Sequence, residues 1–344
     1  MGLYGRILVL LIAYLLAIIR HGSSELNKKK TSTKNPTLVK SASDVTDGVG
    51  LLWETGEGEF LCFQVDGWEG RGDKVVLYMA GLMGSRLESF RSSASSKEKK
   101  LLITIDRPGL GCTPTWGEGG GDTRYVRVAA AALGLVEGLG VGGRGIEVVG
   151  WSSGGAFALA VGARGGEGGG GVKVNHISTV ASDPQWAVVS WPTLLANPAH
   201  IGLYAVVKLK VPRRIIARGA LLVVELLQGL EGLLGISALR DLNYNFGESM
   251  KNGMESALAV AEEIGLERSK EWGFLVEDCC REGVAVTIYH SRGDRLVPFA
   301  ASSDLLSRIG VDTAAVKELP PDGFRLFEEG HLIMETYWEL IVEG

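Results

Sequence analysis

Six short apolar segments constrain the fold of this 344-residue chain more than any other feature. They are rich in β-branched residues, and several are nearly continuous hydrophobic runs, as is typical of strands buried on both faces of a parallel sheet. The segments are KVVLYMA (74–80), LLITID (101–106), IEVVGWS (146–152), VNHISTVAS (174–182), VAVTIYHS (284–291) and AAVKELP (314–320). Helical patterns lie between several of them, at 123–139, after Gly154 and at 300–310. This alternation predicts an α/β fold with a doubly wound, mostly parallel sheet.

A β-hairpin is predicted ahead of these segments. In LLWETGEGEFLCFQV (51–65), two apolar runs flank the turn-forming residues Thr-Gly-Glu-Gly. With the two strands of this hairpin, the predicted sheet has eight strands.

A long interval without strand signals separates the sixth and seventh of these strands. From residue 185 to about residue 278, the chain shows helical patterns at 191–211, 213–235 and 254–274. The second pattern carries a polar stripe on an otherwise apolar helix, formed by Glu225, Gln228 and Glu231. Two interpretations stay open: ordinary helix packing, or a helical cap whose apolar inner face covers a pocket. The position of the interval in the strand order favours the cap.

The chain begins with a separate apolar segment. Residues 7–19 form an uncharged run between Arg6 and Arg20. This length suits the hydrophobic region of a signal peptide better than a membrane span of about 20 residues. Counted from Gly2, with Arg6 reaching to the membrane surface, the segment also fits a short signal anchor, and no clear cleavage site follows the run. Both alternatives predict entry into the secretory pathway or membrane association through residues 7–19.

A basic stretch follows this apolar run. Residues 27–43 are rich in Lys, Ser and Thr and contain no acidic residue, a composition that predicts a disordered linker. We therefore expect residues 1–44 to lie outside the folded domain. The apolar run and the basic stretch together also fit a two-part organelle signal.

Composition excludes several classes of function. The net charge of −5 gives no basic surface for nucleic acid. The four cysteines are too few for a disulfide scaffold, and without a C-x-x-C motif they do not support a zinc or redox site; they are Cys62, Cys112, Cys279 and Cys280. GLGVGG (138–143) matches a dinucleotide-binding pattern, but it follows a helix and precedes a strand, which is the reverse of the required order.

The sequence GWSSG (150–154) fits the pattern G-x-S-x-G between a predicted strand and a predicted helix. At such a turn the central serine has a strained backbone, and glycines two residues before and after it avoid collisions with neighbouring elements. The start of the helix then directs free N–H groups toward developing negative charge. The pattern therefore predicts a nucleophilic serine.

Four other motifs accompany this one. YMAGLMGSR (78–86) resembles an H-G-x-x-G-S loop with Ala80 in place of the histidine, and IDRPGLGCT (105–113) resembles a D-x-P-G-x-G-x-S turn. HSRGDRLVP (290–298) resembles H-G-x-x-D-x-x-V-P, and EEGHLIME (328–335) resembles a late G-H loop. Together the motifs resemble those of capped serine hydrolases of the α/β-hydrolase fold family.

This resemblance covers residues 45–344 and implies a division of the chain. The hydrolase core would comprise residues 45–184 and 278–344. Residues 185–277 would form the inserted helical cap, and residues 1–44 would precede the core.

The resemblance implies a catalytic triad. Ser152 would be the nucleophile, His331 the general base and Asp294 the acid that orients the imidazole. The order Ser-Asp-His along the chain is the order of this fold, and His331 is the only histidine after Asp294. Asp183, which follows the sixth predicted strand, is the alternative acid.

The same resemblance also implies which residues stabilise the oxyanion and which stabilise the loops of the site. The backbone N–H groups of Leu82 and Ser153 would form the oxyanion hole. Only the first of the two adjacent serines has glycine both two residues before and two residues after it, so the hydroxyl of Ser153 should be dispensable. Asp106 and Arg107 are expected to stabilise their own turn, and His290 to brace the loop of the acid.

The implied reaction is the cleavage of a carboxylic ester, or of an amide, through an acyl-enzyme, as in the EC 3.1.1 class of esterases. No cofactor or metal is implied, and the expected partner is a small-molecule ester or a lipid-like substrate. The same triad could instead serve acyl transfer, C–C bond hydrolysis or iminopeptidase cleavage. A non-catalytic ligand-binding protein of the same fold is a further alternative, and the oligomeric state is left open.

Overall fold

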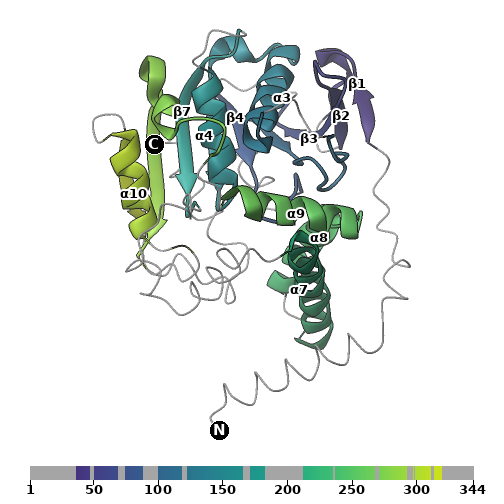
Figure 1. Ribbon diagram of the computed structural model, residues 1–344. Helices are drawn as coiled ribbons and strands as arrows, with labels where there is room; N and C mark the ends of the chain where they lie inside the picture. The colour runs from purple at the N-terminus through teal and green to yellow at the C-terminus, as the bar shows by residue number, and fades with distance from the viewer. Residues whose placement is uncertain are drawn as a thin grey trace. The chain divides into compact units, whose positions relative to one another are not determined.

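A computed structural model describes most of the predicted α/β region (Figure 1). The described residues are 36–46, 50–68, 74–87, 100–117, 122–165, 171–182, 212–234, 237–267, 271–292, 297, 299–310 and 314–319. The apolar N-terminal segment lies outside these ranges, so its role as signal peptide, signal anchor or organelle signal stays a prediction. No helix within the described ranges has the length and hydrophobicity that a membrane crossing requires.

Within the described residues, nine strands form one sheet in the order β1-β2-β3-β5-β4-β6-β7-β8-β9. Their bounds are β1 Thr37–Val39, β2 Leu51–Glu54, β3 Phe60–Asp66, β4 Lys74–Met79, β5 Lys100–Ile105, β6 Ile146–Trp151, β7 Val174–Val180, β8 Ala285–Ser291 and β9 Ala314–Leu319. The β2–β3 and β3–β5 pairs are antiparallel, and the other pairs are parallel. The α/β class, the mostly parallel sheet and the β2–β3 hairpin are therefore confirmed.

The central strands bury side chains on both faces of the sheet. In β4, Val75 and Leu77 belong to the larger hydrophobic cluster, whereas the alternate residues Val76 and Tyr78 belong to a second cluster. All four side chains are at most 1% exposed. This explains why the strand reads as a continuous apolar run, because successive side chains point to opposite faces and both faces are covered.

The described part of the sheet has one strand more than the eight predicted. Strand β1 lies in the stretch that was predicted to be a disordered linker, and it pairs in parallel with β2. The short 3-10 helix η1 (Ala42–Asp44) follows it, and the Asp44 carboxylate accepts hydrogen bonds from the backbone N–H groups of Lys40 and Ser41. The linker prediction is wrong for these residues because it rested on average composition, whereas Val39 is almost fully buried.

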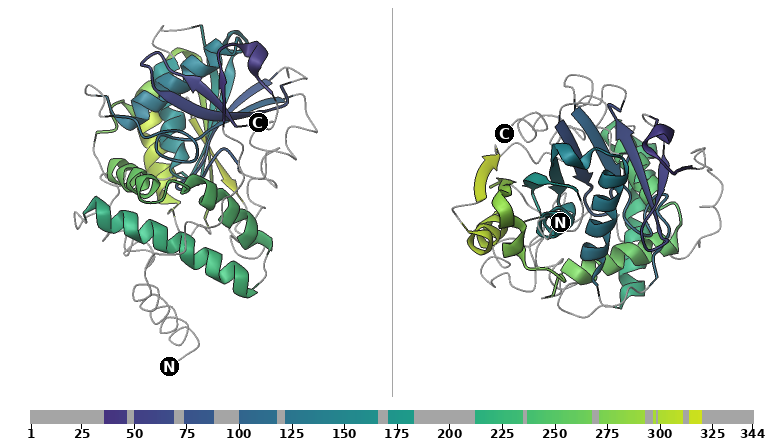
Figure 2. Two further views of the ribbon diagram at one scale, coloured as in Figure 1. Left: turned by 90° about the vertical axis from the view of Figure 1, so that its right-hand side faces the viewer. Right: turned by 90° about the horizontal axis from the view of Figure 1, so that it is seen from above.

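Three of the described helices pack on the face of the sheet that carries the larger cluster. They are α3 (Arg124–Gly138), α4 (Gly154–Gly165) and α10 (Ala300–Ile309), close to their predicted positions. Figure 2 shows these helices against one side of the strands. Their buried side chains, such as Val128, Phe157 and Ile309, belong to the same cluster as Val75 and Leu77.

Among the described residues, three more helices lie between β7 and β8 in the chain. They are α7 (Arg213–Leu234), α8 (Ser237–Ser249) and α9 (Met254–Glu267), and the short helix η3 (Val276–Gly283) leads from them into β8. Helix α7 matches its predicted pattern, and α9 matches the first part of the pattern at 254–274, since residues 271–274 are not helical. Helix α8 was not predicted, and the pattern at 191–211 lies outside the described residues. The bounds of the predicted core and cap stay a prediction.

The inserted helices pack onto loops at the carboxyl ends of the strands. Ala217, Ala220 and Val224 of α7 share a hydrophobic cluster with Met83 and Leu110, which lie in the loops after β4 and β5. Figure 1 shows α9 at the end of the sheet toward which the parallel strands point. Active-site residues of parallel α/β sheets gather at this end, so the insertion borders the region where a site is expected.

Candidate functional site

Ser152 stands at a sharp turn between β6 and α4. Its φ is +52°, in the left-handed region that non-glycine residues rarely adopt. Its backbone N–H donates to the carbonyl oxygen of Val180 at 2.9 Å, and its own carbonyl accepts from the N–H of Gly155 at 2.9 Å. Such strain persists only where the surrounding structure enforces it, and it clusters at functional sites. The side chain of Ser152 is half-buried, whereas Ser153 is only 1% exposed.

The glycines of the motif allow this turn to sit against its neighbours. A Cβ atom on Gly150 would lie 2.5 Å from the carbonyl oxygen of Gly154. A Cβ atom on Gly154 would lie 2.5 Å from the carbonyl oxygen of Ala80, the residue that directly follows β4. Both obstacles are backbone atoms that cannot rotate away, so α4 can begin here only if these positions lack side chains.

The loop after β4 passes directly beside Ser152. A Cβ atom on Gly81 would lie 3.3 Å from the Cβ atom of Ser152. The loop turns tightly, because the N–H of Gly84 donates to the carbonyl oxygen of Gly81 at 2.8 Å and Met83 has a φ of +61°. Leu82, whose N–H was predicted to hold an oxyanion, therefore lies in a tight turn next to the predicted nucleophile.

Arg107 holds this loop through hydrogen bonds to its backbone. Its guanidinium donates to the carbonyl oxygen of Ala80 at 2.5 Å and to that of Gly81 at 2.9 Å. The bracing histidine of the resembling motif is replaced here by Ala80, so Arg107 supplies a brace of a different kind. The sequence predicted only that Arg107 stabilises its own turn, and no local pattern indicated that it reaches the neighbouring loop.

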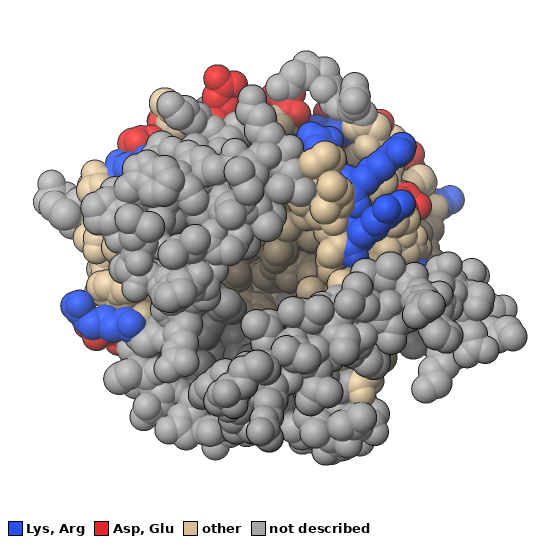
Figure 3. Space-filling view, turned by 60° about the horizontal axis from the view of Figure 1, so that its bottom comes forward, with Lys and Arg blue, Asp and Glu red and all other residues tan. Residues whose placement is uncertain are grey.

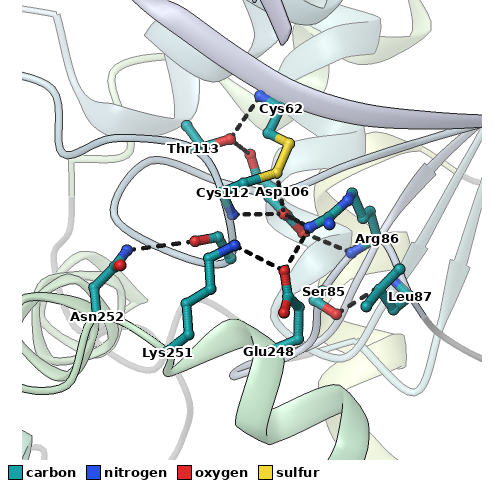
Figure 4. The surroundings of a disulfide bond; sticks show 11 residues. Cys62, Ser85, Arg86, Leu87, Asp106, Cys112, Thr113, Glu248, Lys251 and Asn252 are labelled. Atoms are coloured by element: carbon teal, nitrogen blue, oxygen red, sulfur yellow. Dashed lines mark hydrogen bonds and ion pairs between the residues drawn. A yellow bond between two sulfur atoms is a disulfide. The ribbon is translucent and has the colours of Figure 1, made fainter. Parts of the chain in front are cut away.

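Asp106 organises the turn after β5, as predicted. Its buried carboxylate accepts from the backbone N–H of Arg86 at 2.7 Å and from that of Cys112 at 3.0 Å (Figure 4). The guanidinium of Arg86 pairs with Asp106 and, at 3.1 Å, with Glu248 of α8. Burial alone would lower the pKa of Arg86, but the two carboxylates outweigh it and raise the pKa above its ordinary value.

A disulfide between Cys62 and Cys112 joins β3 to this turn (Figure 4). Their Cα atoms are 5.5 Å apart, although 50 residues separate them in sequence. Sequence spacing gave no sign of this pair, because the distance between two cysteines in a folded chain depends on strand order. The same two sulfurs and Asp106 are the only described group that brings three possible metal ligands together. Because the sulfurs are bonded and Asp106 faces Arg86, this group offers no metal site.

His290 is the last residue but one of β8 and is fully buried. Its Nε2 lies 3.0 Å from the carbonyl oxygen of Val297, and its Nδ1 lies 2.5 Å from the hydroxyl of Ser302. A carbonyl oxygen only accepts, so Nε2 carries a proton and donates it. His290 therefore links β8 to Val297 and to Ser302 of α10, whereas Asp294, whose loop it was predicted to brace, lies outside the described residues.

The other predicted triad members lie outside the described residues. They are Asp294, His331 and the alternative acid Asp183. The structure thus brings together Ser152, Ser153 and Leu82, and the assignment of base and acid stays a prediction from the sequence.

The described charged and uncharged side chains occupy different parts of the surface near the carboxyl ends of the strands (Figure 3). In Figure 3 the described residues visible within a central hollow are uncharged, whereas the described Lys, Arg, Asp and Glu side chains lie nearer the edge of the view. The described part of the hollow is thus better suited to an uncharged ligand than to a strongly ionic one.

Comparison of the sequence with protein-family models and with curated proteins finds no match. Solved structures do match. An esterase from Exiguobacterium antarcticum has a TM-score of 0.56 at 15% identity, over 86% of this chain and 97% of the esterase. A bromoperoxidase from Bacillus anthracis has a TM-score of 0.57 at 15% identity, over 86% of this chain and 100% of its own.

A third similar structure is the 2-hydroxy-6-oxo-6-phenylhexa-2,4-dienoate hydrolase from a Rhodococcus strain. Its TM-score is 0.53 at 15% identity, over 79% of this chain and 90% of the hydrolase. The three proteins bear the names of different reactions. At this identity the likeness identifies a shared fold and does not select a reaction.

Proposed function

The chain has the α/β-hydrolase fold, and from this premise we propose that it is a serine hydrolase that cleaves carboxylic esters through an acyl-enzyme. The observation that carries the proposal is the left-handed backbone of Ser152, at a strand-to-helix turn and beside the loop of Gly81. An ordinary turn does not require a serine to adopt this strained backbone, which costs stability and is found mostly at functional sites.

In the proposed mechanism the Ser152 hydroxyl attacks the ester carbonyl carbon while His331 takes its proton. Asp294 fixes the orientation of the imidazole, with Asp183 as the alternative. The carbonyl oxygen becomes an anion that accepts hydrogen bonds from the N–H groups of Leu82 and Ser153. His331 then gives its proton to the departing alcohol, and water, activated by the same imidazole, releases the acid and restores Ser152.

The substrate we propose is a small uncharged ester or a lipid-like one. The uncharged described lining of the hollow supports this choice, and the similar esterase from Exiguobacterium antarcticum is consistent with it. The predicted cap at 185–277 would set the acyl chain length, which the ester panel below measures.

A panel of p-nitrophenyl esters with acyl chains of increasing length tests the proposal. Wild type should hydrolyse at least one member, and His331→Ala should lower kcat by about 10⁶-fold. Asp294→Asn should lower kcat by about 10⁴-fold, and Asp183→Asn should lower it only slightly, since only the triad acid holds the imidazole. Hydrolysis that survives unchanged in His331→Ala would overturn the mechanism.

Two other chemistries on the same triad are separated by the choice of substrate. The similar Rhodococcus hydrolase is named for a dienoate substrate, which motivates a C–C hydrolase test with a vinylogous 1,5-diketone. Proline p-nitroanilide tests iminopeptidase cleavage. If the purified protein turns over none of these compounds, a non-catalytic binding protein becomes the better account.

We also propose that residues 7–19 tether the protein to a membrane, on the basis of their sequence. Full-length protein should then remain in the membrane fraction after washing with alkaline carbonate. Release of the uncleaved full-length chain by that wash would contradict the tether.

A further inference from the structure

We infer that Arg107 and Glu263 act as a positioning pair for the oxyanion loop, so that helix α9 of the insertion sets the direction of the Leu82 N–H. This inference rests on the proposed function, because it assigns the pair to the same site. It concerns residues that do not touch the substrate and act through the backbone of the loop.

The position of Arg107 is fully enclosed. Its side chain is 1% exposed, and its guanidinium carbon lies 5.2 Å from the ring centre of Phe157 on α4. From there two of its nitrogens donate to the consecutive carbonyl oxygens of Ala80 and Gly81. A guanidinium is planar and rigid, so its contacts hold both carbonyls in one geometry.

Fixing the Gly81 carbonyl also fixes the next N–H. In a trans peptide the C=O and the following N–H point in nearly opposite directions within one plane. The Gly81 oxygen is held on one side by Arg107 and by the N–H of Gly84. The Leu82 N–H of the same peptide unit must therefore point away from Arg107. Gly81 itself adjoins Ser152, which places this N–H in the turn beside the nucleophile.

Arg107 is in turn held by the insertion. Glu263 of α9 is 0% exposed, and its two carboxylate oxygens accept from Arg107 at 2.8 Å and 3.0 Å. This forked arrangement restricts the guanidinium more than a single hydrogen bond would. Arg124 of α3 also approaches Glu263, at 3.1 Å, so one buried carboxylate serves two buried cations. Without its charge, those cations would repel each other and Arg107 would shift.

The neighbouring residue provides a matched control. Glu262 also lies on α9 and pairs with Arg124 at 3.2 Å, but its side chain is 40% exposed, whereas that of Glu263 is fully buried. Replacing Glu262 and Glu263 by glutamine changes the same helix by the same chemistry. Only the change at Glu263 removes the carboxylate that binds Arg107 with both oxygens.

The test measures kcat and KM for the best ester of the panel in Glu263→Gln, Arg107→Lys and Glu262→Gln. Active sites are counted by fluorophosphonate titration, so that unfolded protein does not enter kcat. Outright loss of an oxyanion donor costs about 10²–10³ in rate, so its misdirection should lower kcat by about 10-fold or more. KM should change little, because the ground-state carbonyl depends less on this N–H.

A second readout isolates the oxyanion. A trifluoromethyl ketone adds to a serine hydroxyl and forms a tetrahedral oxyanion, whereas the matching unfluorinated ketone binds mainly as a neutral ligand. In Glu263→Gln and Arg107→Lys, the Ki of the fluorinated ketone should rise in parallel with the loss in kcat/KM. The Ki of the unfluorinated ketone should stay constant, and Glu262→Gln should leave both values unchanged.

The outcomes separate this inference from the proposed function. If wild type shows neither hydrolysis nor labelling, the proposed function fails. If wild type is active and the two variants unfold at a lower temperature but keep kcat per titrated site, the pair is merely structural and the inference fails. Equal losses in the Glu262 and Glu263 variants would also overturn it.

Discussion

At the scale of single residues, the two adjacent serines should behave differently. Ser152 carries the strained backbone, whereas the hydroxyl of Ser153 is buried and has no hydrogen-bond partner among the described residues. Ser152→Ala should abolish ester hydrolysis. Ser153→Ala should keep most of it and cost little stability, because it removes a hydroxyl that makes no bond there and leaves the backbone N–H in place. Equal losses of kcat in the two variants would contradict this assignment.

Residue roles were predictable where they depend on neighbours in sequence. The turn at Ser152 requires small residues two positions away on each side, so GWSSG can be recognised from five consecutive residues. Arg107 could not be predicted in the same way. Its partners Gly81 and Glu263 are 26 and 156 residues distant, and only the folded strand order brings them to one guanidinium.

At the scale of elements, the junction of β6 and α4 should tolerate no side chain at Gly154. Gly154→Ala forces a Cβ atom against the carbonyl oxygen of Ala80 and should lower the free energy of unfolding by about 3 kcal/mol. Gly134, within α3, has open space at its Cβ position. Gly134→Ala should therefore raise the free energy by about 0.5–1 kcal/mol. Urea denaturation of both variants checks this, and similar destabilisation by both would contradict it.

Strand β7 should make stability depend on pH through His176, which accepts or donates a hydrogen bond with Thr287 of β8 at 2.8 Å. Burial, followed by the charges of Lys74 and Lys317, lowers the pKa of His176 below its ordinary 6.5. The unfolded chain then binds a proton at a higher pH than the folded chain does. The contribution of neutral His176 to the free energy of unfolding is therefore complete above pH 6.5. It is lost as the pH falls toward the pKa of His176 in the folded protein.

Urea denaturation at several pH values between 7.5 and 5 measures this effect. The free energy of unfolding of wild type should fall more steeply with decreasing pH than that of His176→Gln, whose amide keeps hydrogen-bonding capacity without titrating. A variant that loses stability as steeply as wild type over this interval would show that His176 is not the source.

At the scale of the whole molecule, the Cys62–Cys112 disulfide closes a loop across the sheet. Closing a loop with a sequence separation of 50 residues stabilises a fold by about 4 kcal/mol through the unfolded state. Reductant should lower the free energy of unfolding of wild type by about this amount. It should not affect the double variant Cys62→Ala/Cys112→Ala.

Cys279→Ala is the control for this experiment, because Cys279 is a buried cysteine that takes no part in the Cys62–Cys112 disulfide. This variant should keep the response to reductant. Alkylation of both Cys62 and Cys112 in the folded protein without prior reduction would contradict the disulfide.

Most of the sheet could be predicted from the sequence, because parallel strands that are buried on both faces appear as continuous apolar runs. Strand β1 was missed because three residues with one buried side chain leave little trace in a basic, Ser/Thr-rich stretch. The disulfide was missed because pairing of Cys62 with Cys112 depends on β3 lying beside β5, an order that the sequence does not state. The base and the acid rest on motifs alone, since His331 and Asp294 lie outside the described residues.

Labelling with a fluorophosphonate probe tests the central claim most directly, because the probe reacts only with an activated serine. Folded wild type should take up one probe molecule, peptide mapping should locate it on Ser152, and Ser152→Ala should remain unlabelled. Folded wild type that stays unlabelled, or that carries the probe on another residue, would contradict the account.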